Sequence, residues 1–190
     1  MAKEKSRLQV KYENEIRPEL MKELGIDNIM AVPNLTKIVV NSGLGEAKVD
    51  RTAIDDMMRD IALITGQKPV ATRSRKAISN FKIREGMDIG VKVTLRRDMM
   101  WYFMDRLISI SLPRIKDFRG IPAKAFDRNG NYALGMNEHT VFPEVDTTQV
   151  TKIRGLQIVI CTSSDNDEHA FKLLEKLGMP FVKSKKKNKS

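Results

Sequence analysis

The chain has 190 residues, of which 41% are hydrophobic, and a formal net charge of +10. A chain of this length buries roughly 70% of its unfolded surface, so one domain over residues 1–182 needs no disulfide or metal. Cys161 is the single cysteine, which excludes a disulfide framework and fits a reducing cytosol. The longest apolar run, residues 99–104, is too short to span a bilayer, and the charged N-terminus lacks a secretory signal. We expect a soluble intracellular protein.

The positive charge is concentrated in three segments. Residues 68–97 carry +7, residues 114–128 carry +3 and residues 183–190 carry +5. A polyanionic partner of definite shape explains this concentration better than a general need for solubility. The last segment has no apolar anchor, so we expect residues 183–190 to form a disordered basic tail.

The first part of the chain predicts two helices and one strand. Residues 3–24 predict a helix with apolar residues spaced four apart, which Pro18 kinks or divides. Residues 35–43 predict a strand that ends in a glycine-containing turn. Asp50 is the expected N-cap of a helix over residues 51–65.

Residues 68–97 combine basic charge with a strand pattern more densely than any other stretch. From Ile89 to Leu95 apolar and polar residues alternate. One face of this strand is therefore expected to meet the core and the other a polyanion. Residues 68–75 predict the partner strand, and the polar connection between the two strands predicts a long hairpin with a basic tip.

The second half of the chain is less regular. Asp98 is the expected cap of a helix that is apolar on most sides, packs deep and ends before Pro113. Residues 113–150 contain many turn signals and predict short strands and loops. The near-continuous apolar run at residues 156–161 is typical of a strand in the centre of a sheet. Asp165 is the expected cap of the last helix.

This order of elements predicts an α+β fold. Helices are expected to cover one face of a mostly antiparallel sheet, and long loops to connect the elements. The other face of the sheet is expected to stay partly open.

Signals of enzymatic or metal-dependent function are weak. Gly43 and Gly45 lie between a strand and a helix, but the remaining residues of a dinucleotide fingerprint or a P-loop are absent. Backbone amides in such a turn can instead hold a nucleic-acid phosphate. His139, His169 and Cys161 show no ligand spacing for zinc. We expect no metal, no cofactor and no catalytic activity, because no nucleophile, base and ligand set converges.

Asn41, Gln67 and Thr94 fall at strand ends or on exposed strand faces, where amide and hydroxyl groups can meet ribose and base edges. The pattern alone is equally compatible with ordinary surface polarity. Two other classes remain open. An RNA-recognition-motif protein would share this layout, but its base-stacking aromatic residues are missing. A small enzyme with a basic cleft is the second alternative.

Long runs of the chain resemble one family. In chain order they are KIVVNSGLGEA, TGQKPVATRSRKAISNFKIREGMDIGVKVTLRRDMMWYFMDRL, KDFRGI, GMNEHTVFPEVD and KIRGLQIVI. These runs are similar to the bacterial large-subunit ribosomal protein L5 family, the 5S rRNA-binding proteins of the central protuberance. The likeness covers nearly the whole chain, from Leu8 to Phe181.

The resemblance implies a non-enzymatic structural constituent of the large ribosomal subunit in the cytoplasm, with RNA on the open face of the sheet. It implies that the chain binds 5S rRNA and helps to attach it to 23S rRNA. It further implies contacts with the peptidyl-site tRNA, with other central-protuberance proteins and with a small-subunit head protein across an intersubunit bridge. No membrane partner is implied.

The resemblance also implies roles for particular residues. Those implied for 5S rRNA binding are Lys37, Asn41, Gln67, Lys92 and Thr94. Those implied for the tRNA-contacting loop are Arg73, Arg75, Lys76, Lys82 and Arg84. Residues 113–145 are implied to reach toward the small subunit. The segment 183–190 extends past the family's usual end near Phe181, so it departs from the family pattern.

Overall fold

The structure, a computed structural model, describes residues 5–48, 50 and 52–182. The segment 183–190, expected as a basic tail, lies outside these residues. The helices are α1 (Arg7–Lys11), α2 (Arg17–Leu24), α3 (Thr52–Thr65), α4 (Arg97–Arg106) and α5 (Asp167–Lys176). The strands are β1 (Leu35–Gly43), β2 (Val70–Arg73), β3 (Asp88–Leu95), β4 (Tyr132–Met136) and β5 (Leu156–Thr162). Short π-helical segments occupy Tyr12–Ile16 and Leu107–Ser111, and 3-10 turns occupy Ile29–Ala31, Gly45–Lys48, Ser79–Phe81, Leu112–Arg114 and His139–Val141.

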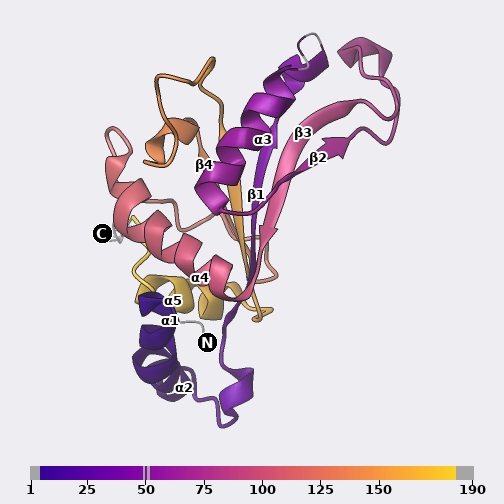
Figure 1. Cartoon of the computed structure of the whole chain (residues 1–190). Coiled ribbons are helices and arrows are strands. Elements are labelled where there is room, and N and C mark those ends of the chain that lie inside the picture. The colour runs from indigo at the N-terminus through magenta and orange to yellow at the C-terminus, as the bar shows by residue number, and fades with distance from the viewer. Residues whose placement is uncertain (1–4, 49, 51, 183–190) are drawn as a thin grey trace, which may run out of the picture.

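The strands form one antiparallel sheet in the order β2-β3-β1-β5-β4 (Figure 1). The predicted hairpin is confirmed, with β2 at one edge of the sheet. The opposite edge is β4. The strand predicted at the centre from residues 156–161 is instead β5, between β1 and β4, and the central strand is β1.

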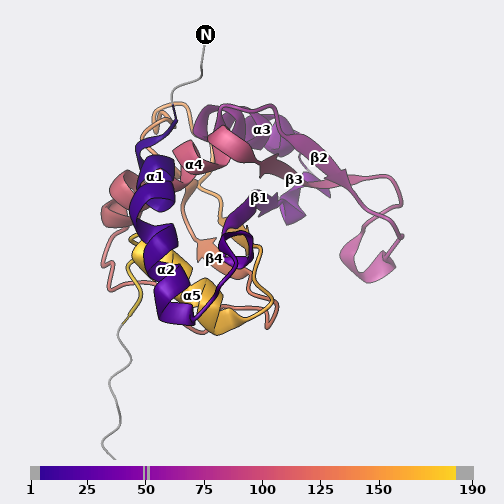
Figure 2. The same ribbon diagram turned by 90° about the horizontal axis from the view of Figure 1, so that it is seen from below.

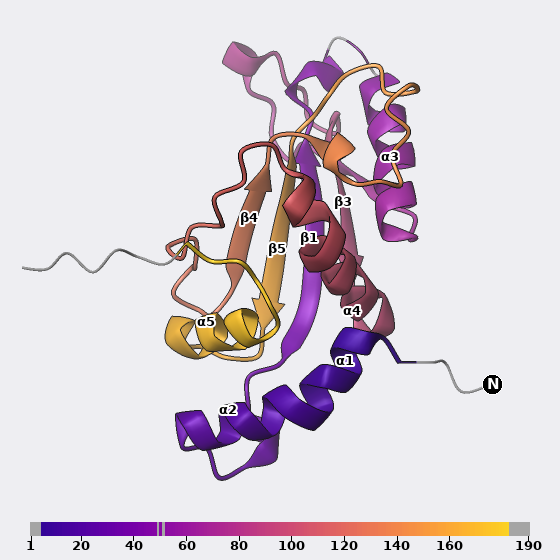
Figure 3. The ribbon, with the colours of Figure 1, turned by 90° about the vertical axis from the view of Figure 1, so that its left-hand side faces the viewer.

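Alternation of side chains gives the sheet two different faces. Val40 of β1 lies opposite Val93 of β3 and Ile158 of β5, and all three are buried. The helices cover this face, with α4 lying across it in Figure 3 and the opposite face uncovered in Figure 2. The structure therefore confirms an α+β fold with helices on one face.

The N-terminal helix packs its predicted apolar face into the core. Leu8, Tyr12, Ile16 and Leu20 are all buried. A π turn at Tyr12–Ile16 divides the helix, with the Arg17 N–H donating to the Tyr12 carbonyl. The π turn directly precedes Pro18, whose missing N–H and bulky ring disfavour an ordinary α-helical turn. The prediction that Pro18 divides this helix is confirmed.

Asp50 caps α3 as predicted. Its Oδ1 accepts a hydrogen bond from the Thr52 N–H at 2.9 Å. At the other end, Gly66 has a left-handed φ of 69°, which suits the residue that follows a helix. Asp60, one turn before the end of α3, is buried.

Two other predicted caps are wrong. Helix α4 begins at Arg97, so Asp98 lies inside the first turn, and Arg96 precedes the helix without a side-chain cap. Helix α5 begins at Asp167, and Asn166 rather than Asp165 accepts from the Glu168 N–H at 2.9 Å. A cap must immediately precede the first helical residue, and each prediction misplaced that residue by one or two positions.

The segment after α4 is also longer than predicted. It continues through a π-helical segment into a 3-10 turn at Leu112–Arg114 that contains Pro113. Proline is tolerated there because the first residues of a helical turn need no N–H partner. Within the described residues, no helix is both long and apolar enough to cross a bilayer.

Candidate nucleic-acid interface

Strand register brings the predicted 5S rRNA-binding residues together on the uncovered face. Asn41 in β1 lies opposite Lys92 in β3, and Thr94 lies two residues further along β3. Lys37 belongs to the same face of β1, because it is four residues from Asn41 in a strand whose side chains alternate. Lys92 is exposed, and the other three are partly exposed. We call this surface the open face.

Gln67 reaches the open face from the end of α3. Its Nε2 donates a hydrogen bond to the Thr94 carbonyl at 3.2 Å. The hydroxyl of Thr65 donates to the Ile61 carbonyl at 2.7 Å, and its oxygen accepts from the Gln67 N–H at 3.4 Å. The exposed amide of Gln67 is therefore held beside β3. The structure thus brings Lys37, Asn41, Gln67, Lys92 and Thr94 into one polar cluster.

The open face continues onto β5 and β4. Gln157 lies opposite Asn41 on β5 and is exposed. Gly135 of β4 lies opposite Gln157, so this row ends without a side chain. The sequence analysis missed Gln157. Its alternation with Leu156 and Ile158 was a usable signal, but the neighbouring Val159 made the strand look apolar on both sides.

Cys161 also lies on this face. It pairs with Lys37 across β1 and β5 and is half-buried. Burial raises the pKa of the Cys161 thiol, so the group stays protonated at neutral pH and acts as a small apolar side chain.

The basic hairpin extends beyond the sheet, as Figure 2 shows for the segment after β2. Backbone hydrogen bonds order the segment between its strands. The Ser74 N–H donates to Met87 at 2.8 Å, and Ile78 and Ile83 exchange bonds of 2.9 and 3.1 Å. The hairpin tip is thus a shaped structure.

The cations of the hairpin are exposed. Arg73 lies 3.3 Å from the carboxylate of Asp88. Arg75, Lys76, Lys82 and Arg84 form no ion pair with any described residue. Their charge is therefore available to an anionic partner. The structure groups these predicted tRNA-contacting residues on one projection, separate from the polar cluster of the open face.

The turn containing Gly43 and Gly45 does not form a phosphate cradle of the P-loop type. The Leu44 N–H donates to the Ile89 carbonyl at 2.8 Å, and the Ala47 N–H donates to Leu44 at 3.1 Å. These amides are consumed within the fold. Between residues 5 and 182, apart from positions 49 and 51, no group of His, Cys, Asp and Glu side chains could hold a metal.

A different polar contact explains the buried His139. Its Nδ1 accepts from the Arg154 N–H at 3.1 Å, which leaves the ring proton on Nε2. Nε2 lies 3.3 Å from Oδ2 of Asp60, although the geometry falls short of a good hydrogen bond. The pair joins α3 to the turn after β4, so His139 has a structural environment.

An open polar sheet face beside a projection of exposed cations defines a protein that binds a structured polyanion. Comparison with known proteins identifies its family. Residues 28–84 match the family described as ribosomal protein L5, and residues 88–181 match the family described as the C-terminus of these ribosomal proteins. The chain therefore belongs to the ribosomal protein L5 family, which confirms the resemblance found in the sequence.

Relatives match along nearly their whole length. The chain is 54% identical over 178 residues to large ribosomal subunit protein uL5 of Caldanaerobacter subterraneus, covering 94% of this chain and 99% of that protein. It is 54% identical over 175 residues to the uL5 protein of Chloroflexus aurantiacus, covering 92% and 97%. The uL5 protein of Mesoplasma florum is 51% identical over 179 residues, covering 94% and 99%.

Proposed function

We propose that this chain, a structural constituent of the large ribosomal subunit in the cytoplasm, binds 5S rRNA through its open face. It thereby helps to attach 5S rRNA to 23S rRNA in the central protuberance. The family consists of structural ribosomal proteins and not of enzymes. We further propose that the basic hairpin contacts the peptidyl-site tRNA, and that residues 113–145 reach a small-subunit head protein across an intersubunit bridge.

The observation that carries the proposal is the convergence of Asn41, Lys92 and Thr94 with Gln67 on one rigid, helix-free sheet face. Amides and hydroxyls on neighbouring strands can meet 2′-hydroxyls and base edges at fixed spacing. The described strands carry no aromatic side chain on this face. Recognition by shape and hydrogen bonding is therefore favoured over base stacking, which argues against the RNA-recognition-motif alternative.

The proposal is tested by replacing Asn41 and Thr94 together with alanine. We expect 5S rRNA affinity to fall roughly ten- to thirty-fold, since each lost hydrogen bond contributes about 1 kcal/mol. The matched control replaces Asn137 and Thr147, which are exposed and make no side-chain hydrogen bond with described residues. A gel-shift titration measures both. Equal affinities for the two double variants would contradict the proposed 5S site.

A further inference from the structure

The edge of the sheet opposite the hairpin carries a second set of exposed cations. Cations on the helices, such as Arg7 and Lys176, pair with carboxylates at 2.8 and 3.0 Å. The loop before β4 differs. Its cations are exposed and form no ion pair with any residue that the structure describes; they are Arg114, Lys116, Arg119, Lys124 and Arg128. We call this set the β4-edge stripe.

The stripe runs along β4 from end to end. Lys116 lines a small cavity with Gly135 and Met136, at the end of the strand. Lys124 lies two residues before Phe126, which bridges to Tyr132 at the start of the strand. Since β4 rises about 3.4 Å per residue, the stripe extends roughly 15 Å.

The backbone of the stripe is fixed to the rest of the fold. The Ile121 N–H donates to the Pro180 carbonyl at 2.9 Å, and the Ala133 N–H donates to the Ala125 carbonyl at 3.0 Å. Gly120 has a φ of 100°, and a Cβ there would lie 2.9 Å from the Pro180 oxygen. The chain is therefore held close to the C-terminal segment, and only side-chain freedom is lost when the cations bind a partner.

The acids of the same loop do little to neutralise the stripe. Asp127 closes a turn by accepting from the Asn131 side chain at 2.8 Å and from the Asn129 N–H at 2.9 Å. These hydrogen bonds, led by that of the Asn131 side chain, lower the pKa of Asp127. Its carboxylate is thus directed into the turn. The only other acid of residues 114–128 is Asp117.

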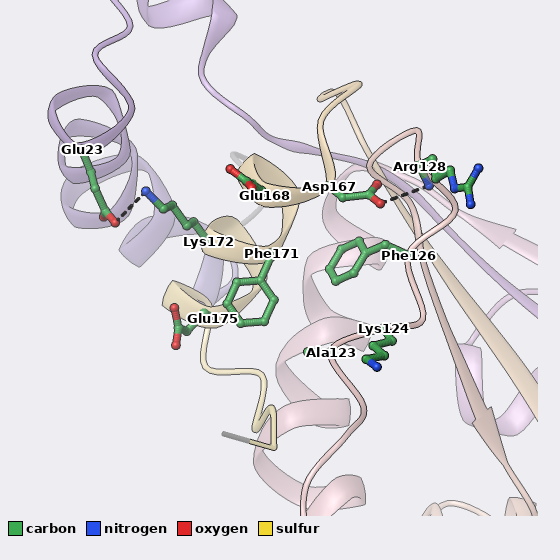
Figure 4. A pocket seen from close by; sticks show the side chains of 10 residues that line it. All are labelled: Glu23, Ala123, Lys124, Phe126, Arg128, Asp167, Glu168, Phe171, Lys172 and Glu175. Atoms are coloured by element: carbon green, nitrogen blue, oxygen red, sulfur yellow. Dashed lines mark hydrogen bonds and ion pairs between the residues drawn. The ribbon is translucent and has the colours of Figure 1, made fainter. Parts of the chain in front are cut away.

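A cavity beside the stripe has the opposite polarity on its far wall. The cavity, of about 610 Å³, separates the loop from α5. Figure 4 shows Lys124 and Arg128 on the loop side, and Glu168 and Glu175 on α5. Carboxylates on α5 repel phosphate, so an RNA backbone fits along the stripe and not inside the cavity.

We propose that the β4-edge stripe is a second RNA-binding surface, which follows the phosphate backbone of an RNA duplex other than 5S rRNA. Lys and Arg at fixed positions along an edge suit phosphates, and no base-reading element accompanies them. Four inter-strand spacings of about 4.8 Å place β2 and β4 roughly 19 Å apart. The open face, the hairpin and the stripe can therefore be occupied together. The inference rests on the proposed function only for the identity of the RNA on the open face.

The test uses the full chain saturated with 5S rRNA and a fluorescent short RNA duplex of unrelated sequence. The stripe variant combines Lys116→Glu with Lys124→Glu. The control, Lys11→Glu with Lys22→Glu, changes the net charge equally at exposed helix positions that form no ion pair with described residues. We expect the stripe variant to bind the duplex about ten-fold more weakly, with a salt slope shallower by about 2. We expect the control to lose less than about two-fold, and both variants to keep their 5S rRNA affinity.

Each other outcome overturns the inference. Equal losses in both variants mean that only overall charge matters. Unchanged duplex binding in the stripe variant, or no duplex binding by the parent complex, means that the stripe does not bind RNA. Loss of 5S rRNA affinity in the stripe variant alone means that the stripe belongs to the 5S site. Failure of the parent chain to bind 5S rRNA contradicts the proposed function instead, and the duplex titration of the RNA-free chain then tests the stripe separately.

Discussion

Single buried residues couple distant parts of this fold. Asp60 and His139 are both buried, one on α3 and the other in the turn after β4. The Arg154 N–H fixes the tautomer of the imidazole, so its remaining proton faces Asp60. A buried polar group that loses its only acceptor keeps its full desolvation cost. The contact therefore matters more to stability than its 3.3 Å length alone indicates.

We expect Asp60→Ala to lower the free energy of unfolding by about 1–3 kcal/mol, because the His139 N–H then lacks an acceptor in the core. Asp55→Ala is the control, since Asp55 is exposed on the same helix and its loss should change stability by less than about 0.5 kcal/mol. Urea denaturation followed by circular dichroism measures both. Equal midpoints for the two variants would show that the Asp60–His139 contact is not stabilising.

At the scale of the element, β3 illustrates how alternation assigns side chains to core or partner. Val91, Val93 and Leu95 are buried, whereas Lys92 between them is exposed. A shift of one residue would exchange the two sets. The register predicted from the sequence is confirmed.

We expect Val93→Asp to destabilise the fold by several kcal/mol, because it places an unpaired carboxylate on the covered face of the sheet. Lys92→Ala, one residue away, should leave the melting transition nearly unchanged, since its side chain is exposed. Thermal melts followed by circular dichroism decide between them. A more harmful Lys92→Ala would mean that the two faces of β3 are reversed.

The sequence predicted β1, β3 and most helix faces because local periodicity determines them. It predicted less where tertiary structure decides. Gln157 joins the open face only because β5 pairs with β1, and Asp60 meets His139 only once α3 packs beside the turn after β4. The caps of α4 and α5 were misplaced because several polar residues precede each helix, and backbone geometry selects among them.

In the whole molecule, the sheet order separates surfaces that suit different partners. The open face is rigid, since its polar residues lie on hydrogen-bonded central strands. The hairpin cations lie at the far end of the β2 edge, on a projection with few contacts to the core (Figure 1). Rigid placement suits a permanent RNA partner, whereas long cationic side chains on a projecting loop suit a tRNA that must arrive and leave.

This separation predicts the effect of reversing charge on the hairpin alone. Arg75→Glu with Lys76→Glu is the informative variant, because neither side chain pairs with a described residue, whereas reversing Arg73 would also place a carboxylate beside Asp88. We expect the variant to keep 5S rRNA affinity within about three-fold in a gel shift, because phosphate contacts elsewhere are retained. Ribosomes carrying it should release peptidyl-site tRNA faster in filter-binding assays. If instead the reversal abolishes 5S rRNA binding while Asn41→Ala with Thr94→Ala has no effect, the hairpin itself is the 5S site and the proposed division between the two surfaces is wrong.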